Sequence, residues 1–210
     1  DEFNYGLLGY PLLQTADILS VQGEWVPVGK DQLAHLEISR DIVTRFNHMY
    51  QSSLFTPPKP LLTQTPSLPG LDGRKMGKSY GNGIYLCDTE EETALKLKQG
   101  ITDPQRLRRT DPGDPKQCSV IYQYYTVFAN KDQQQQTAQA CSTAAQGCMD
   151  CKKQLAEIIN NHLAPIRQRR QQLAQDPDTV WDILRHGAQT AQRICEQTLH
   201  QVRQAMCLTL

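Results

Sequence analysis

A short basic segment rich in glycine is the part of this sequence best suited to chemistry. Lys75 and Lys78 stand three residues apart in Lys75-Met-Gly-Lys-Ser79, and glycines occupy positions 70, 73, 77, 81 and 83. A lysine ammonium binds phosphate as a compact point charge, and glycine lets the backbone approach a ligand closely. The pattern therefore predicts a mobile loop that closes over phosphates. The simpler alternative is a solvated surface loop that happens to read Lys-x-x-Lys.

A second candidate is the turn Gly29-Lys-Asp-Gln32, which follows the apolar run 25–28 and precedes a helical pattern. Ligands of open α/β sheets bind beyond the carboxyl ends of the strands, where a helix N-terminus offers unpaired N–H groups. The turn is therefore expected to contact a ligand. The alternative is that Asp31 only caps the helix.

A third candidate is a polar stripe. Tyr10, Gln14 and Asp17 fall at helical spacing, opposite Leu12, Ala16 and Leu19. A phenol, an amide and a carboxylate on one side would suit a small ligand with a polar head. The alternative is that this is the solvent face of the helix.

The elements around these residues predict an α/β fold. A short helix is expected over 10–21, with Tyr10 just outside it because proline follows. A strand over 25–28 and a helix from Asp31 to Tyr50 make half of a βαβ unit, which indicates a parallel sheet.

The rest of the chain changes character along its length. Proline-rich residues 51–74 are expected to form a loop, and Thr89 with Glu92 predicts a capped helix that ends at Gly100. Residues 102–116 read as a linker. From residue 120 onward the chain is helical and holds 16 Gln in residues 131–210. A domain boundary is therefore expected near residue 115.

Composition narrows the class of protein. The 210 residues carry 22 basic and 22 acidic side chains, so no global field draws the chain to nucleic acid or membrane. Seven cysteines without framework spacing predict reduced thiols in a cytosolic protein. Cys148 and Cys151 resemble half of a metal site, but no second Cys-x-x-Cys accompanies them, so no metal is assigned.

Three ordered segments carry a family resemblance: YPLLQTADIL, VPVGKDQLAHLEISRDIVTRFN and DGRKMGKSYGN. Together they resemble the bacterial tryptophanyl-tRNA synthetases, a family of class I aminoacyl-tRNA synthetases, and the basic loop matches the KMSKS signature. The resemblance implies the second half of a Rossmann-like catalytic domain over 1–115 and an all-α tRNA (anticodon)-binding domain over 116–210. It further implies activation of L-tryptophan with ATP and Mg²⁺, transfer to tRNA(Trp), a homodimer and a cytoplasmic location.

The same resemblance implies residue roles. Asp17 would accept the indole N–H of tryptophan, and Tyr10 and Gln32 would hold its head group with Gln14 nearby. Lys75, Lys78 and Ser79 would act in catalysis on the phosphates. The residues implied in ATP binding are Gly29, Lys30, Asp31, Leu68, Lys75, Met76, Gly77, Lys78 and Ser79.

The sequence departs from the family pattern at several points. Gly77 stands where the signature usually has Ser, Lys30 where many relatives have Glu, and Gln14 where Met is common. The family's HIGH signature would lie upstream of residue 1, so residues 1–210 alone are expected not to form tryptophanyl-adenylate. Two alternatives stay open: a tyrosyl-type synthetase and a non-catalytic RNA-binding or regulatory paralogue. Contacts to RNA phosphates are expected from two arginine groups, Arg106, Arg108 and Arg109, and Arg167, Arg169 and Arg170.

Overall fold

The computed structural model describes residues 4–62 and 67–208 and divides the chain into two compact units. Unit 1 comprises Asp1–Gln64 together with Pro177–Leu210, and unit 2 comprises Thr65–Asp176. The chain therefore leaves unit 1 after its first strands and returns to it with its last helix.

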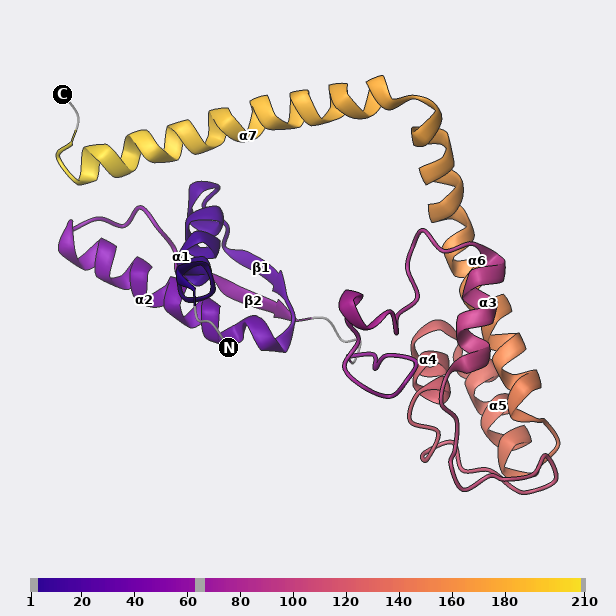
Figure 1. Ribbon diagram of the computed structural model, residues 1–210. Coiled ribbons are helices and arrows are strands. Elements are labelled where there is room, and N and C mark those ends of the chain that lie inside the picture. The colour runs from indigo at the N-terminus through magenta and orange to yellow at the C-terminus, as the bar shows by residue number, and fades with distance from the viewer. Residues whose placement is uncertain (1–3, 63–66, 209–210) are drawn as a thin grey trace. The chain divides into compact units, whose positions relative to one another are not determined.

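Unit 1 is built on two parallel strands with helices beside them (Figure 1). In the register of the pair, Trp25 lies opposite Lys59 and Val28 lies opposite Leu62. The first strand leads through a short 3-10 helix into α2, as the βα pattern predicted. The elements of unit 1 are α1 (Tyr5–Ser20), β1 (Trp25–Val28), η1 (Lys30–Gln32), α2 (Leu33–Met49), β2 (Lys59–Leu62) and α7 (Pro177–Ala205).

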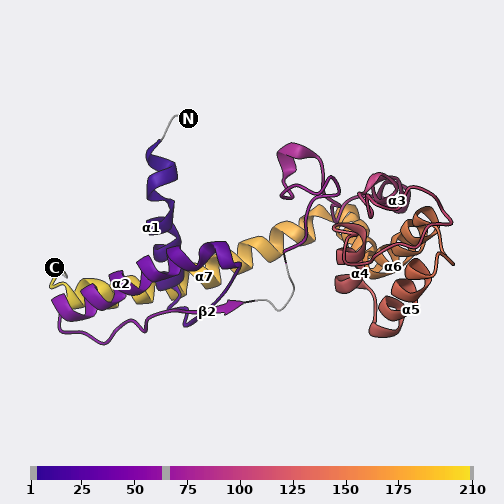
Figure 2. The same ribbon diagram turned by 90° about the horizontal axis from the view of Figure 1, so that it is seen from below.

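Helix α1 begins earlier than predicted. Its N-cap is Asn4, whose side-chain oxygen accepts a hydrogen bond from the Leu7 N–H at 3.0 Å. Tyr10 therefore lies inside the helix rather than before it, and Pro11 is an interior proline. The N-terminal turns of α1 extend away from α2 (Figure 2), and Tyr5 there is 80% exposed.

Helices α1 and α2 meet through a polar contact. The hydroxyl groups of Thr15 and Ser39 lie 2.8 Å apart and both residues are buried. The carbonyls of Pro11 and His35, each one turn earlier in the same helix, lie within hydrogen-bond distance of these hydroxyls, so one hydroxyl donates to its carbonyl and accepts from the other. This pairing satisfies the two hydroxyls, so burying them between the helices leaves no unpaired polar group.

Strand β2 lies in a segment that the prolines predicted to be a loop. The N–H of Lys59 donates to the carbonyl of Glu24 at 2.8 Å and starts the pairing with β1. Pro27 and Pro60 both lie within the strands. Proline is tolerated at strand edges, and each strand of this pair has a free edge among the described residues. The prediction of a loop over this segment was wrong, because proline argues against a strand in general and the sequence does not show that this strand lies at an edge of the sheet.

Unit 2 is helical and carries its own core. Helices α3 and α6 lie side by side, α4 packs against α6, and α5 packs against α4 (Figure 1). The core is formed by Leu71, Leu97, Val120, Ile121, Tyr124, Tyr125, Ala129, Leu155, Ala156, Ile159 and Leu163. The elements of unit 2 are η2 (Lys78–Tyr80), α3 (Glu90–Gln99), α4 (Ile121–Phe128), α5 (Lys131–Ser142) and α6 (Cys148–Gln175).

Residues 102–116 are not a linker. Asp103 is buried, and its carboxylate accepts hydrogen bonds from the N–H groups of Gln105 and Asp114. The N–H of Gly113 donates to the carbonyl of Cys141 at 3.0 Å. Hydrogen bonds hold this segment in place. The sequence analysis relied on hydrophobic periodicity, which the segment lacks, and therefore predicted a linker.

The capped helix was predicted correctly. Thr89 accepts from the Glu92 N–H, and the Glu92 side chain accepts from the Thr89 N–H. Beyond residue 120 the chain is helical as expected, but α7 packs with unit 1 rather than with the other helices. The division near residue 115 was expected from a change in composition, and it stays a prediction.

Two further properties concern the described residues as a whole. No described helix combines the length and the hydropathy that crossing a membrane requires. All seven cysteines are free thiols.

Candidate functional site

Four polar side chains of unit 1 form one hydrogen-bonded chain, here called the head-group relay: Asp31, Gln32, His35 and Tyr10. The Gln32 amide nitrogen donates to Asp31 Oδ2 at 3.1 Å, and Gln32 Oε1 lies 3.0 Å from His35 Nδ1. His35 Nε2 lies 2.8 Å from the Tyr10 hydroxyl. Tyr10 and Gln32, which were predicted to hold an amino-acid head group, are therefore linked through His35, a residue for which the sequence predicted only a structural or solvated role.

The polar stripe of α1 lies only partly where it was expected. Tyr10 and Asp17 are exposed, and Gln14 is half-buried. The helix buries Thr15 and Ile18 against unit 1, whereas Leu12 and Ala16, expected on the buried side, are exposed.

Among the described residues the Asp17 carboxylate has no ion-pair or hydrogen-bond partner. It therefore presents both oxygens to solvent and can accept from a ligand N–H.

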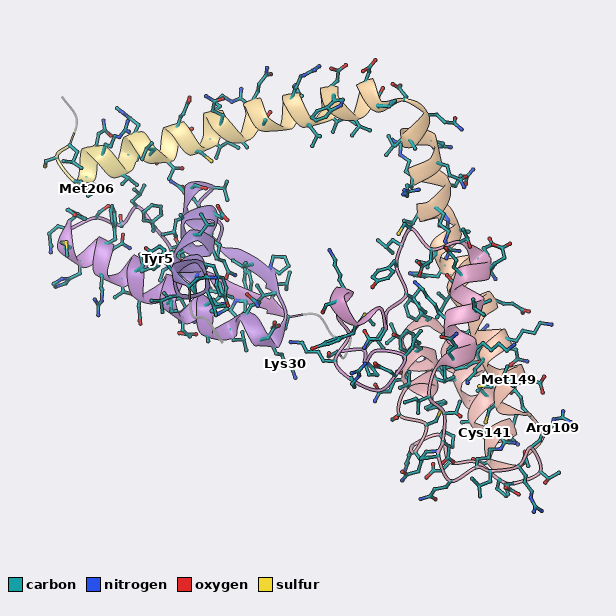
Figure 3. All side chains as sticks on the ribbon, viewed as in Figure 1. Tyr5, Lys30, Arg109, Cys141, Met149 and Met206 are labelled. Carbon is teal, nitrogen blue, oxygen red and sulfur yellow. The ribbon has the colours of Figure 1, made fainter. Side chains whose placement is uncertain are left out.

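The turn after β1 has an open geometry. Gly29 is the N-cap of η1 with an extended backbone, and Lys30 is exposed at the N-terminal end of α2 (Figure 3). Asp31 lies inside η1, and the N-cap of α2 is Gln32, so Asp31 does not occupy the cap position that the simpler alternative gave it. Its carboxylate orients Gln32 instead.

The basic loop of unit 2 folds around one buried amide. The Asn82 side chain donates to Asp72 Oδ1 at 2.8 Å and to the carbonyl of Lys75 at 3.2 Å. Its own Oδ1 accepts from the Gly77 N–H at 3.0 Å. Gly70 lies so close to this amide that a methyl group there would overlap it. Asn82 therefore fixes the path of the loop on both sides of the signature.

The two signature lysines lie at the surface of the loop. Lys75 and Lys78 are exposed, as are Met76 and Ser79. Within the described ranges neither ammonium has an acidic partner, because Asp72 pairs with Arg74 at 2.6 Å. The hydrogen bond from Asn82, with help from Arg74, lowers the pKa of Asp72 to about 2. The loop thus offers two uncompensated positive charges.

The core of unit 2 anchors the loop at its start. Leu71 belongs to that core, and Leu68 packs against it half-buried. The Tyr124 hydroxyl donates to the carbonyl of Pro69 at 2.9 Å, and burial raises the pKa of Tyr124 to about 12. Leu68 therefore has a packing role, which stands beside the adenine contact predicted for it.

The two arginine groups are only partly free. Arg106 donates to the carbonyls of Arg109 and Gln146, both at 2.7 Å. Arg167 donates to the Asn160 side chain at 2.9 Å and to the Thr93 hydroxyl at 2.8 Å, which ties α6 to α3. These two arginines hold unit 2 together, whereas Arg108, Arg109, Arg169 and Arg170 are exposed.

Four cysteines line one small cavity of about 30 Å³ in unit 2. Cys148 and Cys151, the pair that resembles half of a metal site, are joined there by Cys118 and Cys141. Cys141 lies at the end of unit 2 that also carries Arg109 (Figure 3). Burial raises the pKa of Cys151 to about 12. In the part of the chain that the structure covers, no three His, Cys, Asp or Glu side chains are arranged to hold a metal ion.

Comparisons with known proteins show the family of this chain. The family model for tRNA synthetases class I (W and Y) matches residues 1–164. The chain therefore belongs to the class I tRNA synthetases of the tryptophan and tyrosine type.

Within that class the chain is similar to bacterial tryptophan–tRNA ligases. It is 43% identical over 204 residues to that of Aquifex aeolicus and 42% identical over 214 residues to that of Thermotoga maritima. The match covers 97% and 99% of this chain but 51% and 65% of those proteins. This confirms the resemblance that the three sequence segments carry.

A solved structure supports the same relationship. The tryptophanyl-tRNA synthetase of Campylobacter jejuni, complexed with ADP and tryptophan, superposes with a TM-score of 0.82 at 29% identity. The superposition covers 99% of this chain and 64% of that one. The predicted Rossmann-like half followed by helices is confirmed, and the chain spans about half to two thirds of the length of these relatives.

Proposed function

We propose that the protein carrying this sequence activates L-tryptophan with ATP and transfers it to tRNA(Trp). The observation that carries the proposal is the basic loop, which folds around Asn82 and leaves Lys75 and Lys78 without acidic partners among the residues that the structure describes. Two unpaired ammonium groups suit a triphosphate. The names of the relatives support tryptophan as the amino acid and the ligase as the activity.

Each predicted site residue has a chemical task in this proposal. Lys75 and Lys78 stabilise the charge that develops on the leaving pyrophosphate as the tryptophan carboxylate attacks the α-phosphorus, and Ser79 assists through its hydroxyl. Gly29, Lys30 and Asp31 contact the nucleotide, together with Leu68 and the backbone of Met76 and Gly77. Such a displacement depends on positioning and charge stabilisation more than on covalent chemistry.

The amino acid is recognised at two places. Asp17 accepts the indole N–H, while Tyr10 and Gln32 hold the head group with Gln14 beside them. A site built to hydrogen-bond an N–H rejects an analogue without it by about 10⁴–10⁵-fold. Mg²⁺ enters with ATP as part of the substrate. A helical tRNA-binding region over 116–210, a homodimer and a cytoplasmic location complete the proposal.

Tryptophan-dependent exchange of pyrophosphate into ATP tests the reaction. We expect exchange with tryptophan and not with tyrosine in the protein that carries this sequence, and far less in the isolated 210 residues. Exchange with tyrosine would favour the tyrosyl-type alternative. Binding of tRNA without any exchange would favour the non-catalytic paralogue.

Single substitutions test the assignment of residues. Asp17→Ala is expected to abolish exchange and leave the unfolding midpoint unchanged, because the Asp17 side chain is exposed and has no partner in the described part of the chain. Asp41→Ala, another exposed aspartate of unit 1, is the control. Near-normal exchange in Asp17→Ala would remove this residue from the site.

The loop lysines have a matched control as well. Lys78→Ala is expected to lower the exchange rate by about 10²–10³-fold, the usual cost of one preorganised donor. Lys153→Ala removes an exposed lysine elsewhere in unit 2 and is expected to have no effect.

A further inference from the structure

We infer that His35 is a positioning residue that turns the Tyr10 hydroxyl into a hydrogen-bond acceptor for the ammonium group of the amino acid. This inference rests on the proposed function and deepens it, because it names the residue that selects a cationic head group. It is carried by the head-group relay, all of whose members belong to unit 1.

The direction of each hydrogen bond follows from the carboxylate at one end. An ionised Asp31 can only accept, so Gln32 turns its NH₂ toward it at 3.1 Å and its carbonyl oxygen toward His35. An amide oxygen also only accepts, so His35 Nδ1, 3.0 Å away, carries the proton. In a neutral imidazole the other nitrogen is then an acceptor.

The consequence for Tyr10 is specific. Its hydroxyl lies 2.8 Å from His35 Nε2 and must donate its single proton there. The lone pairs that remain on the phenol oxygen can only accept. The edge-on contact between the two rings, with centroids 4.8 Å apart, holds the phenol in that direction. Tyr10 therefore offers lone pairs to a ligand.

Gln32 is polarised in the same sense. One N–H of its amide donates to Asp31, and its carbonyl oxygen accepts from His35 and keeps one lone pair. A phenol oxygen whose proton is donated to His35 favours an ammonium and disfavours a carboxylate. The relay thus predicts recognition of the α-ammonium group, not merely contact with a polar head.

The test compares analogues that lack one charged group. In the protein that carries this sequence, tryptamine keeps the ammonium and indole-3-propionate keeps the carboxylate. We expect His35→Phe to weaken inhibition of exchange by tryptamine by about 3- to 10-fold, the usual value of one hydrogen bond. Inhibition by indole-3-propionate should stay within twofold. The KM for tryptophan should rise with little change in kcat.

Two variants separate positioning from packing. His35→Gln places an amide oxygen that can accept from Tyr10 and is expected to restore most of the tryptamine inhibition. His48→Phe makes the same change at an exposed position of α2 and is expected to alter nothing. Equal weakening of both analogues, or of neither, in His35→Phe would overturn the inference.

A spectroscopic readout does not depend on activity. We expect ¹⁵N NMR of the 210-residue chain to show His35 as the Nδ1–H tautomer, with an Nε2 shift that moves in Tyr10→Phe. An Nε2–H tautomer would overturn the inference even if exchange is normal. Absence of exchange in the unsubstituted protein would instead count against the proposed function and leave the NMR result standing.

Discussion

Asn82 lowers the pKa of Asp72, its neighbour in the basic loop. Its amide donates to Asp72 at 2.8 Å, and the folded protein lowers the pKa of Asp72 from 3.8 to about 2. Because the folded pKa is the lower one, this carboxylate stabilises the fold above pH 3.8, and that stabilisation is lost as the pH falls through about 2.

Asn82→Ala is therefore expected to raise the pKa of Asp72 toward 3.8 and to make the loop less sensitive to acid in the range between the two values. Carbon-detected NMR titration of the Asp72 carboxyl measures this directly. Asn161→Ala, an exposed asparagine on α6, should leave the titration unchanged. A pKa of Asp72 that stays near 2 in Asn82→Ala would contradict the assignment.

Single residues also set how far the sequence could predict the site. The sequence could predict Lys75, Lys78 and the turn after β1, because the residues of each motif lie close together along the chain. His35 could not, because its role depends on Tyr10, which lies 25 residues away and contacts it only after α1 and α2 pack. A histidine three residues after Gln32 on one helix face was the only signal available.

The N-cap of helix α3 contributes to the stability of unit 2. Helix α3 begins with a reciprocal pair of bonds between Thr89 and Glu92, and Arg167 of α6 docks on its Thr93. Thr89→Ala is expected to lower the free energy of unfolding by about 1 kcal/mol. Thr143→Ala, which alters a hydroxyl at the end of α5, should stay within about 0.5 kcal/mol of zero. Hydrogen exchange of the α3 amides is the measurement, and equal losses in the two variants would argue against the cap.

Gly70 and Gly187 differ in the reason why a side chain at that position would change stability. Gly70 packs against Asn82, whereas Gly187 in α7 has nothing within 4 Å of an added methyl group. Gly70→Ala is expected to destabilise unit 2 by about 1–3 kcal/mol through overpacking. Gly187→Ala should stabilise α7 by about 0.5–1 kcal/mol. Urea unfolding followed by hydrogen exchange checks both signs, and a loss of stability in Gly187→Ala would show that α7 is covered there.

At the level of elements, the sequence predicted those with a local signal. Strand β1 and the cap of α3 follow from neighbouring residues. Strand β2 was missed because its prolines read as loop, and the ordered segment 102–116 was missed because buried Asp103 organises it through hydrogen bonds. Both the strand and the ordered segment depend on contacts between residues that are not neighbours in the sequence, and a single sequence gives little information about such contacts.

The chain crosses between its two units twice, after residue 64 and after residue 176. The residues proposed to bind tryptophan lie in unit 1 and the signature lysines in unit 2. The proposed roles are therefore divided between residues of both units.

The seven cysteines are spread over both units, and the rate at which each thiol is alkylated measures how readily its region becomes accessible to solvent. Cys87 and Cys207 are exposed, whereas burial raises the pKa of Cys118, Cys141 and, to about 12, Cys151. Against an ordinary value of 9.0, the thiolate fraction of Cys151 at pH 8 is lower by roughly 1,000-fold. Because the thiolate is the reactive form, iodoacetamide is expected to label Cys87 and Cys207 first, as followed by peptide mass spectrometry. Labelling of Cys151 as fast as that of Cys87 would mean that the α5–α6 end of unit 2 opens readily, since a protonated thiol inside an intact core cannot react at that rate.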